Sequence, residues 1–333
     1  MAKTLVTGGT GFLGTHLLNL LLEEAESEIR VLTTGDGKLL DPSFEVVNGS
    51  VLSKQDLLDA VEGVDHIYHL AGKVSRNPED KHEMYAIHVE GTRNLCEAAK
   101  KAGVKRIVLA STSGTIAVTE KGEEVPDETY PTPIDICSRW PYYASKIYQE
   151  ETARRGCGDK VELVILNPSL LLGPGDSRLS STQDILKFLG KDIPAMPSGG
   201  INFVDVRDVA KTFVAAMKQG RAGECYLLGG PNWTFEKFFA RLERLTNVSA
   251  PKFRAPAKLG IWGAKVADAF YRHWDKVPPL DVTSVEMAEY FWYLDPSKAE
   301  RELGFVSRDP SETLYDTVKY LKETFMSDNI FSK

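Results

Sequence analysis

Cysteine is scarce in this chain of 333 residues. The cysteines form no Cys-x-x-Cys pair and have no cluster of histidines near them, so the sequence indicates neither a metal site nor a disulfide framework. A reducing compartment fits this pattern best, and we expect a cytoplasmic protein. The four cysteines are Cys96, Cys137, Cys157 and Cys225.

Long apolar runs and an excess of positive charge are also missing. No apolar stretch reaches the ~18 residues that could span a bilayer, and no cationic segment with an apolar signal core precedes the first expected strand. We therefore expect no stable membrane insertion. The formal net charge of -7 argues against a general binder of nucleic acid or of anionic membranes. An anionic cofactor would have to be held by local groups.

Glycine, in contrast, is concentrated near the start of the chain, in the run Gly8-Gly9-Thr10-Gly11-Phe12-Leu13-Gly14. An expected strand at residues 4–7 precedes this run, and residues 12–24 read as a helix. In a dinucleotide site, Gly8 would permit a tight turn, Gly11 would let the backbone approach a pyrophosphate, and Gly14 would allow close helix packing. The spacing is Gly-x-x-Gly-x-x-Gly. A purely structural turn is the alternative, and we favour the dinucleotide site.

Strand-like and helix-like segments alternate through the first half of the chain. This alternation predicts an α/β fold, a Rossmann-type doubly wound parallel sheet with helices on both faces. Ligands bind at the carboxyl ends of such strands, where the turns Leu70-Ala71-Gly72, Ser111-Thr112-Ser113 and Asn167-Pro168 are expected to converge. The expected strands are 29–33, 44–47, 66–70, 106–110 and 161–166, and the expected helices are 54–61, 83–102 and 142–155.

After Pro168 the pattern loosens, with loops at 173–176 and 194–200. A strand at 202–204, a helix at 205–219 and a strand at 225–228 return to the sheet. We expect residues 1–167 and 205–229 to form the dinucleotide-binding domain, and residues 168–204 and 230–333 to form a smaller, mostly helical substrate-binding region. Within it, residues 258–274 are apolar on much of the helix circumference, as in a lid over a lipophilic substrate, an ordinary core helix or a dimer contact.

Tyr142 and Lys146 are four residues apart in an expected helix and therefore share a face. A free phenol has a pKa near 10 and exchanges protons poorly at neutral pH. A cation beside it favours the phenolate, so we expect the pKa of Tyr142 to move toward the working range of a general acid or base. A chance pair on an exposed helix is the alternative.

Taken together, these motifs resemble those of the extended short-chain dehydrogenase/reductases, the NAD-dependent epimerase/dehydratase superfamily, and most closely its dihydroflavonol reductase-like and 3β-hydroxysteroid dehydrogenase-like branch. The resemblance implies hydride transfer between a nicotinamide and a carbonyl or alcohol carbon, with Tyr142 as acid/base and Lys146 also holding the nicotinamide ribose. It also implies a possible homodimer. Its marks are the glycine run, residues 69–72, 88–92 and 202–210, Tyr142 with Lys146, and residues 293–299 with 302–305.

The same resemblance assigns a hydroxyl that binds the substrate oxygen to Thr112, with Ser113 as the runner-up. Relatives that dehydrate nucleotide sugars resemble Thr-Asp-Glu here, whereas this chain has Thr112-Ser113-Gly114, which disfavours dehydratase chemistry. His88 stands where an Asn is usual, and we interpret it as a packed histidine, with a proton relay as the alternative. Gly72 replaces a common Ala, a change that we expect to be harmless.

Cofactor choice is read at the end of the second strand, at Thr33 and Thr34, where neither the acid typical of NAD nor the Arg typical of NADP is present. Thr34 with Lys38 favours NADP, whereas Asp36 keeps NAD open. Ser50 replaces an Asp that commonly contacts adenine. The glycine loop and the resemblance together place on the cofactor Gly8, Gly11, Phe12, Leu13, Gly14, Thr34, Ser50, Val51, Leu70, Ala71, Gly72, Tyr142, Lys146, Asn167, Pro168 and Leu170.

Three functions remain open at this stage. The favoured one is an NAD(P)-dependent ketone reductase or secondary alcohol dehydrogenase that acts on a small or medium, lipophilic or aromatic carbonyl. The second is a nucleotide-sugar 4-epimerase, in which hydride is taken from and returned to the same carbon. The third is a non-catalytic dinucleotide-sensing protein, which would need the glycine loop but not Tyr142, Lys146 and Thr112.

Overall fold

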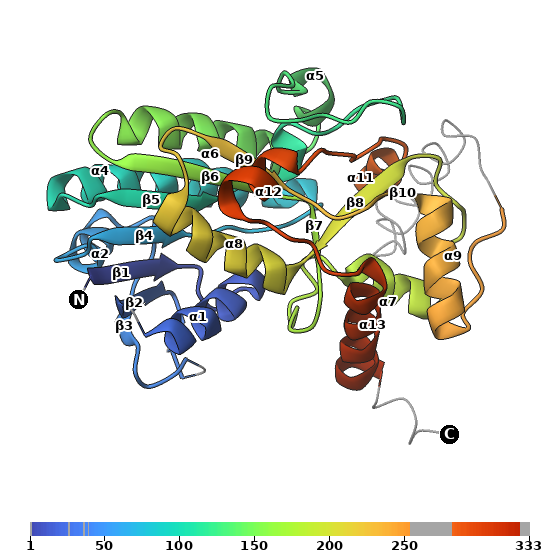
Figure 1. Ribbon diagram of the computed structural model, residues 1–333, viewed down its shortest axis with the longest axis horizontal. Helices are drawn as coiled ribbons and strands as arrows, with labels where there is room; N and C mark the ends of the chain where they lie inside the picture. The colour runs from blue at the N-terminus through green and yellow to red at the C-terminus, as the bar shows by residue number, and fades with distance from the viewer. Residues whose placement is uncertain (1, 26, 36, 39, 254–281, 327–333) are drawn as a thin grey trace.

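A seven-stranded parallel sheet forms the centre of the molecule, with strand order β3-β2-β1-β4-β5-β6-β9 (Figure 1). The computed structural model describes residues 2–25, 27–35, 37–38, 40–253 and 282–326. The predicted α/β class and parallel sheet are confirmed. The strands are β1 (Ala2–Thr7), β2 (Ser27–Thr33), β3 (Glu45–Asn48), β4 (His66–His69), β5 (Arg106–Ala110), β6 (Glu162–Pro168) and β9 (Cys225–Leu228).

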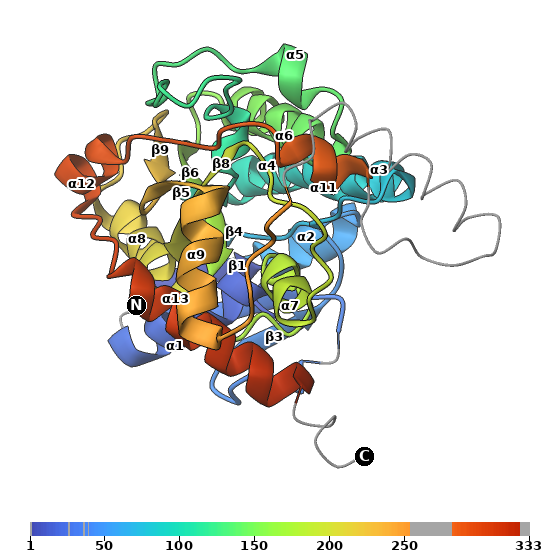
Figure 2. The ribbon, with the colours of Figure 1, turned by 90° about the vertical axis from the view of Figure 1, so that its right-hand side faces the viewer.

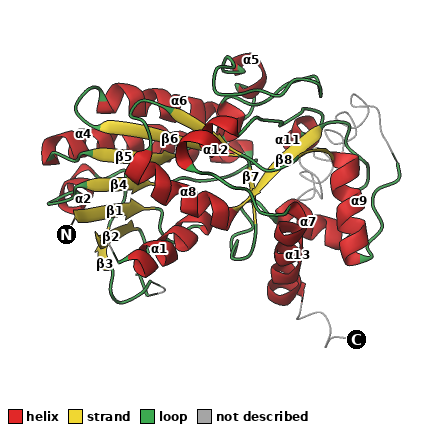
Figure 3. Cartoon of the chain, viewed as in Figure 1, coloured by secondary structure: helices red, strands yellow, loops and turns green. Residues whose placement is uncertain are grey.

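Helices cover both faces of this sheet because successive strand residues point to opposite sides and both sides are apolar (Figure 3). In β1, for example, Val6 packs into one core with α1, α8 and α12, while Leu5 packs into the other with α2, α4 and α6. These helices are α1 (Phe12–Glu24), α2 (Lys54–Ala60), α4 (Thr92–Ala102), α6 (Pro141–Cys157), α8 (Val206–Gln219) and α12 (Ser297–Leu303).

Residues 83–102 are helical throughout, as predicted, but the type of helix changes along them. The chain forms α3 (Lys81–Tyr85), a π-helical segment (Ala86–Gly91) and then α4. Gly91, at the end of the π-helical segment, lies close to the loop after β3. A Cβ at this position would lie 2.7 Å from Val51 Cγ2. Periodicity alone does not distinguish a π-helical turn from an α-helical one, so the prediction missed it.

A second unit lies beyond the carboxyl edge of the sheet (Figure 1), and it faces the viewer in Figure 2. Its three-stranded sheet has the order β10-β8-β7, and its core is rich in aromatic side chains such as Phe203 and Trp233. Its remaining described elements are helices. The strands and helices of this unit are β7 (Leu170–Leu172), α7 (Gln183–Leu189), β8 (Gly200–Asp205), β10 (Asn232–Thr234), α9 (Phe235–Thr246), α11 (Val282–Met287) and α13 (Pro310–Leu321).

The apolar segment at 258–274 lies outside the described residues. Among the helices that are described, none has both the length and the apolar character to cross a membrane.

Candidate active site

The glycine run forms a turn between β1 and α1 that is built to receive an anion. Gly8 has a φ of +73°, and Gly11 N–H donates to Gly8 O at 3.0 Å. Gly11 is the N-cap of α1, yet no side chain caps this end and the first turn carries no acid. The N–H groups of that turn are therefore available, together with the positive end of the helix dipole, for a pyrophosphate. These residues fit a dinucleotide.

Two close contacts explain why glycine is needed in this turn. A Cβ on Gly14 would lie 2.2 Å from Gly8 O, and a Cβ on Gly8 would lie 2.6 Å from Ala71 N. The first contact lets α1 pack directly on the turn, and the second brings the loop after β4 beside it. The structure thus brings together the predicted residues Leu70, Ala71 and Gly72 with the glycine run. Phe12 and Leu13 follow as the first residues of α1.

Tyr142 is placed by the first turn of α6, which Pro141 begins with its fixed φ. The hydroxyl of Thr112 hydrogen-bonds the phenol of Tyr142 and lowers its pKa, but burial outweighs this effect and raises the pKa of Tyr142 to about 12. The expectation of a lowered pKa was therefore wrong for this structure, because desolvation of the phenolate dominates. At neutral pH, Tyr142 carries its proton and is ready to donate it.

Lys146 lies one turn further along α6 and is buried. Its Nζ donates to Ala110 O at 2.7 Å and also to Gln149 Oε1. Burial lowers the pKa of Lys146 to about 7, while the nearby Glu150 opposes the shift. An ammonium has three N–H donors, so one of them remains for a ligand such as a ribose hydroxyl.

A buried chain of hydrogen bonds connects Lys146 to the loop after β4, which lies beside the glycine run. Gln149 must present its Oε1 to the ammonium, so its Nε2 donates to Thr92 Oγ1 at 2.9 Å. Thr92 Oγ1 lies 2.9 Å from His69 Nε2, and His69 Nδ1 lies 2.7 Å from Thr7 Oγ1. Thr7 Oγ1 in turn accepts the Ala71 N–H at 3.2 Å.

This chain fixes Lys146 relative to the loop after β4. Sequence reasoning missed Gln149, although its position three residues after Lys146 on the same helix could have indicated a contact.

Glu150 and Asn167 form a second support, which holds the turn after β5. Glu150 Oε1 accepts from Ser111 Oγ at 2.5 Å, from Thr115 Oγ1 at 2.8 Å and from Asn167 Nδ2 at 2.8 Å. Asn167 Nδ2 also donates to Thr112 O at 3.2 Å. The predicted residue Asn167 thus reaches the Thr112 turn with its side chain, and its buried Oδ1 has no partner among the described residues. Glu150 was missed, although it lies eight residues after Tyr142 on the same helix face.

His88 is buried, and both of its ring nitrogens are hydrogen-bonded. Its Nε2 accepts the Lys73 N–H at 3.1 Å, so the ring proton is on Nδ1, 2.8 Å from Ser145 Oγ. Ser145 Oγ then donates to Tyr142 O at 2.7 Å. Burial lowers the pKa of His88, so the ring is neutral. This is the arrangement of a packed histidine, and it supports the backbone of Tyr142.

Gly72, which stands where an Ala is expected, lies next to His88, which stands where an Asn is expected. A Cβ on Gly72 would lie 3.0 Å from His88 Nε2. We expect Gly72→Ala to lower the free energy of unfolding by about 1 kcal/mol, because overpacking forces the ring to shift. Adding His88→Asn is expected to relieve this cost. Urea denaturation of the four proteins of this double-mutant cycle measures the coupling, and purely additive effects would contradict the pairing.

At the expected adenine end, Thr33 Oγ1 accepts the Gly35 N–H at 3.1 Å, and Thr34 is exposed. Ser50 is engaged locally, since its N–H donates to Asp56 Oδ2 at 2.8 Å and its Oγ accepts the Leu52 N–H at 3.2 Å. Val51 packs in the core beside Gly91. Asp36 lies outside the described residues. On the nicotinamide side, Pro168 ends β6 and Leu170 begins β7.

Aromatic rings gather next to Tyr142. The ring centroid of Tyr143 lies 5.0 Å from that of Tyr142 and 4.9 Å from that of Trp292. Gly114 makes this possible, because a Cβ there would lie 2.2 Å from Tyr143 Cε1. We call this cluster the aromatic wall. It consists of Trp140, Tyr143, Tyr290 and Trp292.

Comparison with known proteins identifies relatives along the whole chain. Residues 4–229 match the model of the NAD dependent epimerase/dehydratase family. The chain is 32% identical over 325 residues to a putative dihydroflavonol 4-reductase of Synechocystis, covering 95% of this chain and 94% of the relative. It is 30% identical over 329 residues to sterol demethylase protein B of Methylococcus capsulatus, covering 97% and 99%. The crystal structure of gox2253 superposes with a TM-score of 0.81 at 28% identity, covering 97% and 98%.

Proposed function

The chain belongs to the NAD dependent epimerase/dehydratase family and is an oxidoreductase, and from this premise we propose that it is an NAD(P)-dependent ketone reductase or secondary alcohol dehydrogenase with a Thr112-Tyr142-Lys146 site. The observation that carries the proposal is that the Thr112 side chain stands close enough to the half-buried Tyr142 phenol to lower its pKa, with Lys146 one turn further along the same helix. A sensor of dinucleotides would have no use for such a pair.

Each of the three residues has a distinct task in reduction. A bound nicotinamide dinucleotide supplies the hydride to the carbonyl carbon. Tyr142, protonated because its pKa is about 12, donates its proton to the carbonyl oxygen. Thr112 orients that oxygen and stabilises its developing charge. Lys146 holds the ribose with its remaining N–H and places positive charge near the phenolate that forms, which lowers the cost of losing the proton.

We propose a lipophilic or aromatic substrate because the aromatic wall stands beside Tyr142. Trp140 is buried and supports Trp292, with ring centroids 5.6 Å apart, whereas Tyr143 and Trp292 remain partly exposed. Such a surface favours flat apolar groups over the hydroxyl-rich face of a sugar. Two relatives, the putative dihydroflavonol 4-reductase of Synechocystis and a cinnamoyl-CoA reductase 1 of Oryza sativa, have names that refer to aromatic compounds, which agrees with this choice.

For the cofactor, NADP remains our choice over NAD. No acid is present at Thr33 or Thr34 to repel a 2′-phosphate, and Thr34 is exposed at the carboxyl edge where the ribose is expected. Titration of nicotinamide fluorescence with NADPH and NADH decides between them. Tighter binding of NADH would overturn the choice.

The decisive assay follows NADPH or NADH absorbance in the presence of aromatic ketones and, separately, nucleotide sugars. We expect a ketone to consume the reduced cofactor with the formation of an alcohol. If a nucleotide sugar is isomerised with no net oxidation, and no ketone is reduced, the 4-epimerase is the correct function instead. If cofactor binds and neither substrate class reacts, the enzyme assignment fails for these classes.

Thr112→Val tests the hydroxyl, with Ser113→Ala as the matched control in the same turn. We expect Thr112→Val to lower kcat/KM about tenfold to a hundredfold, the usual effect of losing one hydrogen bond to a developing charge. Ser113→Ala should change kcat/KM little, because Ser113 is buried behind the turn. The reverse ranking of the two variants would move the role to Ser113.

A further inference from the structure

Two cysteines that are far apart in the sequence meet on the face of the sheet covered by α4 and α6. Cys96 lies in α4 and Cys157 is the last residue of α6, and their sulfurs are 3.6 Å apart. Gly156 allows this approach, since a Cβ there would lie 2.8 Å from Cys96 Cβ. Both thiols are buried and neither forms a disulfide. Nothing in the proposed reaction uses them.

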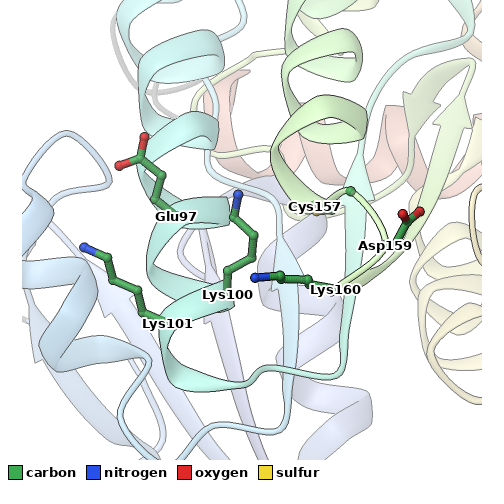
Figure 4. A pocket seen from close by; sticks show the side chains of 7 residues that line it. Glu97, Lys100, Lys101, Cys157, Asp159 and Lys160 are labelled. Atoms are coloured by element: carbon green, nitrogen blue, oxygen red, sulfur yellow. The ribbon is translucent and has the colours of Figure 1, made fainter.

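Cys157 also borders an open surface pocket of about 530 Å³. Lys100 and Lys101 of α4 and Lys160 beyond α6 line this pocket, as do the acids Glu97 and Asp159 (Figure 4). The two sulfurs therefore differ in their surroundings. Cys157 is the one that borders the pocket, although its side chain is buried.

The electrostatic surroundings favour negative charge on Cys157 over Cys96. The hydrogen bond between the two thiols lowers the pKa of Cys157, and Lys100 lowers it further, while burial opposes both. The same hydrogen bond and burial raise the pKa of Cys96, and Lys100 opposes them. Since the thiolate is the reactive form, Cys157 is the expected nucleophile and Cys96 the expected resolving thiol.

We propose that Cys96 and Cys157 are an oxidation site, at which a hydroperoxide converts the thiol pair into a reversible intramolecular disulfide. The Cys157 thiolate attacks one peroxide oxygen, the O–O bond breaks, and the other oxygen leaves as an alcohol or water after it takes a proton. Cys96 then attacks the sulfur of the resulting sulfenic acid and releases water. The two thiols lose two electrons and two protons, and the peroxide is reduced by the same two electrons.

The position of this bond determines what it changes. It joins the middle of α4 to the end of α6, whereas Tyr142 and Lys146 lie in the first half of α6. It also closes a loop between residues 61 positions apart in the sequence. A cross-link of that span restricts the unfolded chain, so the oxidised protein is expected to unfold at a higher temperature.

The test uses the full chain, hydrogen peroxide and no substrate, so its outcome is independent of the proposed reductase activity. After oxidation, free thiols are alkylated under denaturing conditions, and the digested peptides are analysed by mass spectrometry with and without reductant. We expect a peptide pair linked through Cys96 and Cys157, which disappears on reduction. In Cys96→Ser, we expect a sulfenic acid at Cys157 that dimedone traps.

Cys225→Ser is the matched control, because it removes a thiol that lies outside the pair. It should give the same linked peptides as the original protein. Cys96 and Cys157 both remaining alkylatable after Cys225 has been oxidised would overturn the proposal. So would a disulfide that joins either of them to Cys137 or Cys225. Because the mapping is done on the unaltered chain, the result stands even if a serine variant fails to fold.

Discussion

Tyr142→Phe is expected to lower turnover by two or more orders of magnitude, the usual effect of losing a general acid. The variant removes the group that gives its proton to the substrate oxygen in our mechanism, and it leaves the Thr112 hydroxyl in place. Cofactor binding, measured by nicotinamide fluorescence, should remain close to that of the unaltered protein, because the glycine turn and Lys146 are untouched. The loss should therefore appear in kcat.

Tyr148→Phe is the control for this variant. Tyr148 lies on the same helix, six residues further on, and its side chain is exposed. It should retain full turnover. If Tyr142→Phe retains turnover as well, Tyr142 is not the acid and the proposed mechanism is wrong. If it loses both turnover and cofactor binding, the effect comes from disruption of the site.

The fold was predictable because each strand and helix carries its own local pattern. β5 and β9 have the same bounds as predicted, and α1 begins and ends where the prediction placed it. The parallel order then follows from the alternation of strands and helices. The π-helical segment before α4 was not predictable in the same way, because the period of apolar residues does not distinguish a π-helical turn from an α-helical one.

The site was predictable at the level of residue types and strand ends, but its electrostatics were not. The i, i+4 spacing correctly indicated that Tyr142 and Lys146 share a helix face. It did not indicate that both groups lose solvent, and this desolvation is what raises the pKa of Tyr142 to about 12 and lowers the pKa of Lys146 to about 7. Nor could spacing indicate the link from Gln149 through Thr92 to His69, whose members come from three separate elements.

Lys146→Met is expected to change how stability depends on pH, in addition to impairing catalysis and cofactor binding. The pKa of Lys146 is lowered from 10.5 to about 7 in the folded protein. Between these two values the unfolded chain binds a proton at this site that the folded chain does not bind. The free energy of unfolding therefore falls as pH drops from about 10.5 to about 7, by up to about 1.4 kcal/mol per pH unit.

Below pH 7 the site carries its proton in both states, so this contribution stays constant. Urea denaturation of both proteins at pH 7 and pH 9 isolates the effect, because the other titrating groups are common to both. The free energy of unfolding of the original protein should rise relative to that of the Met variant from pH 7 to pH 9. An equal difference at both values would mean that Lys146 keeps an ordinary pKa.

The charge of Lys146 would then be present throughout the neutral range, and the rate of reduction would not fall as pH rises through 7. A reductase with the lowered pKa should lose that rate, since the ammonium that supports Tyr142 loses its proton there.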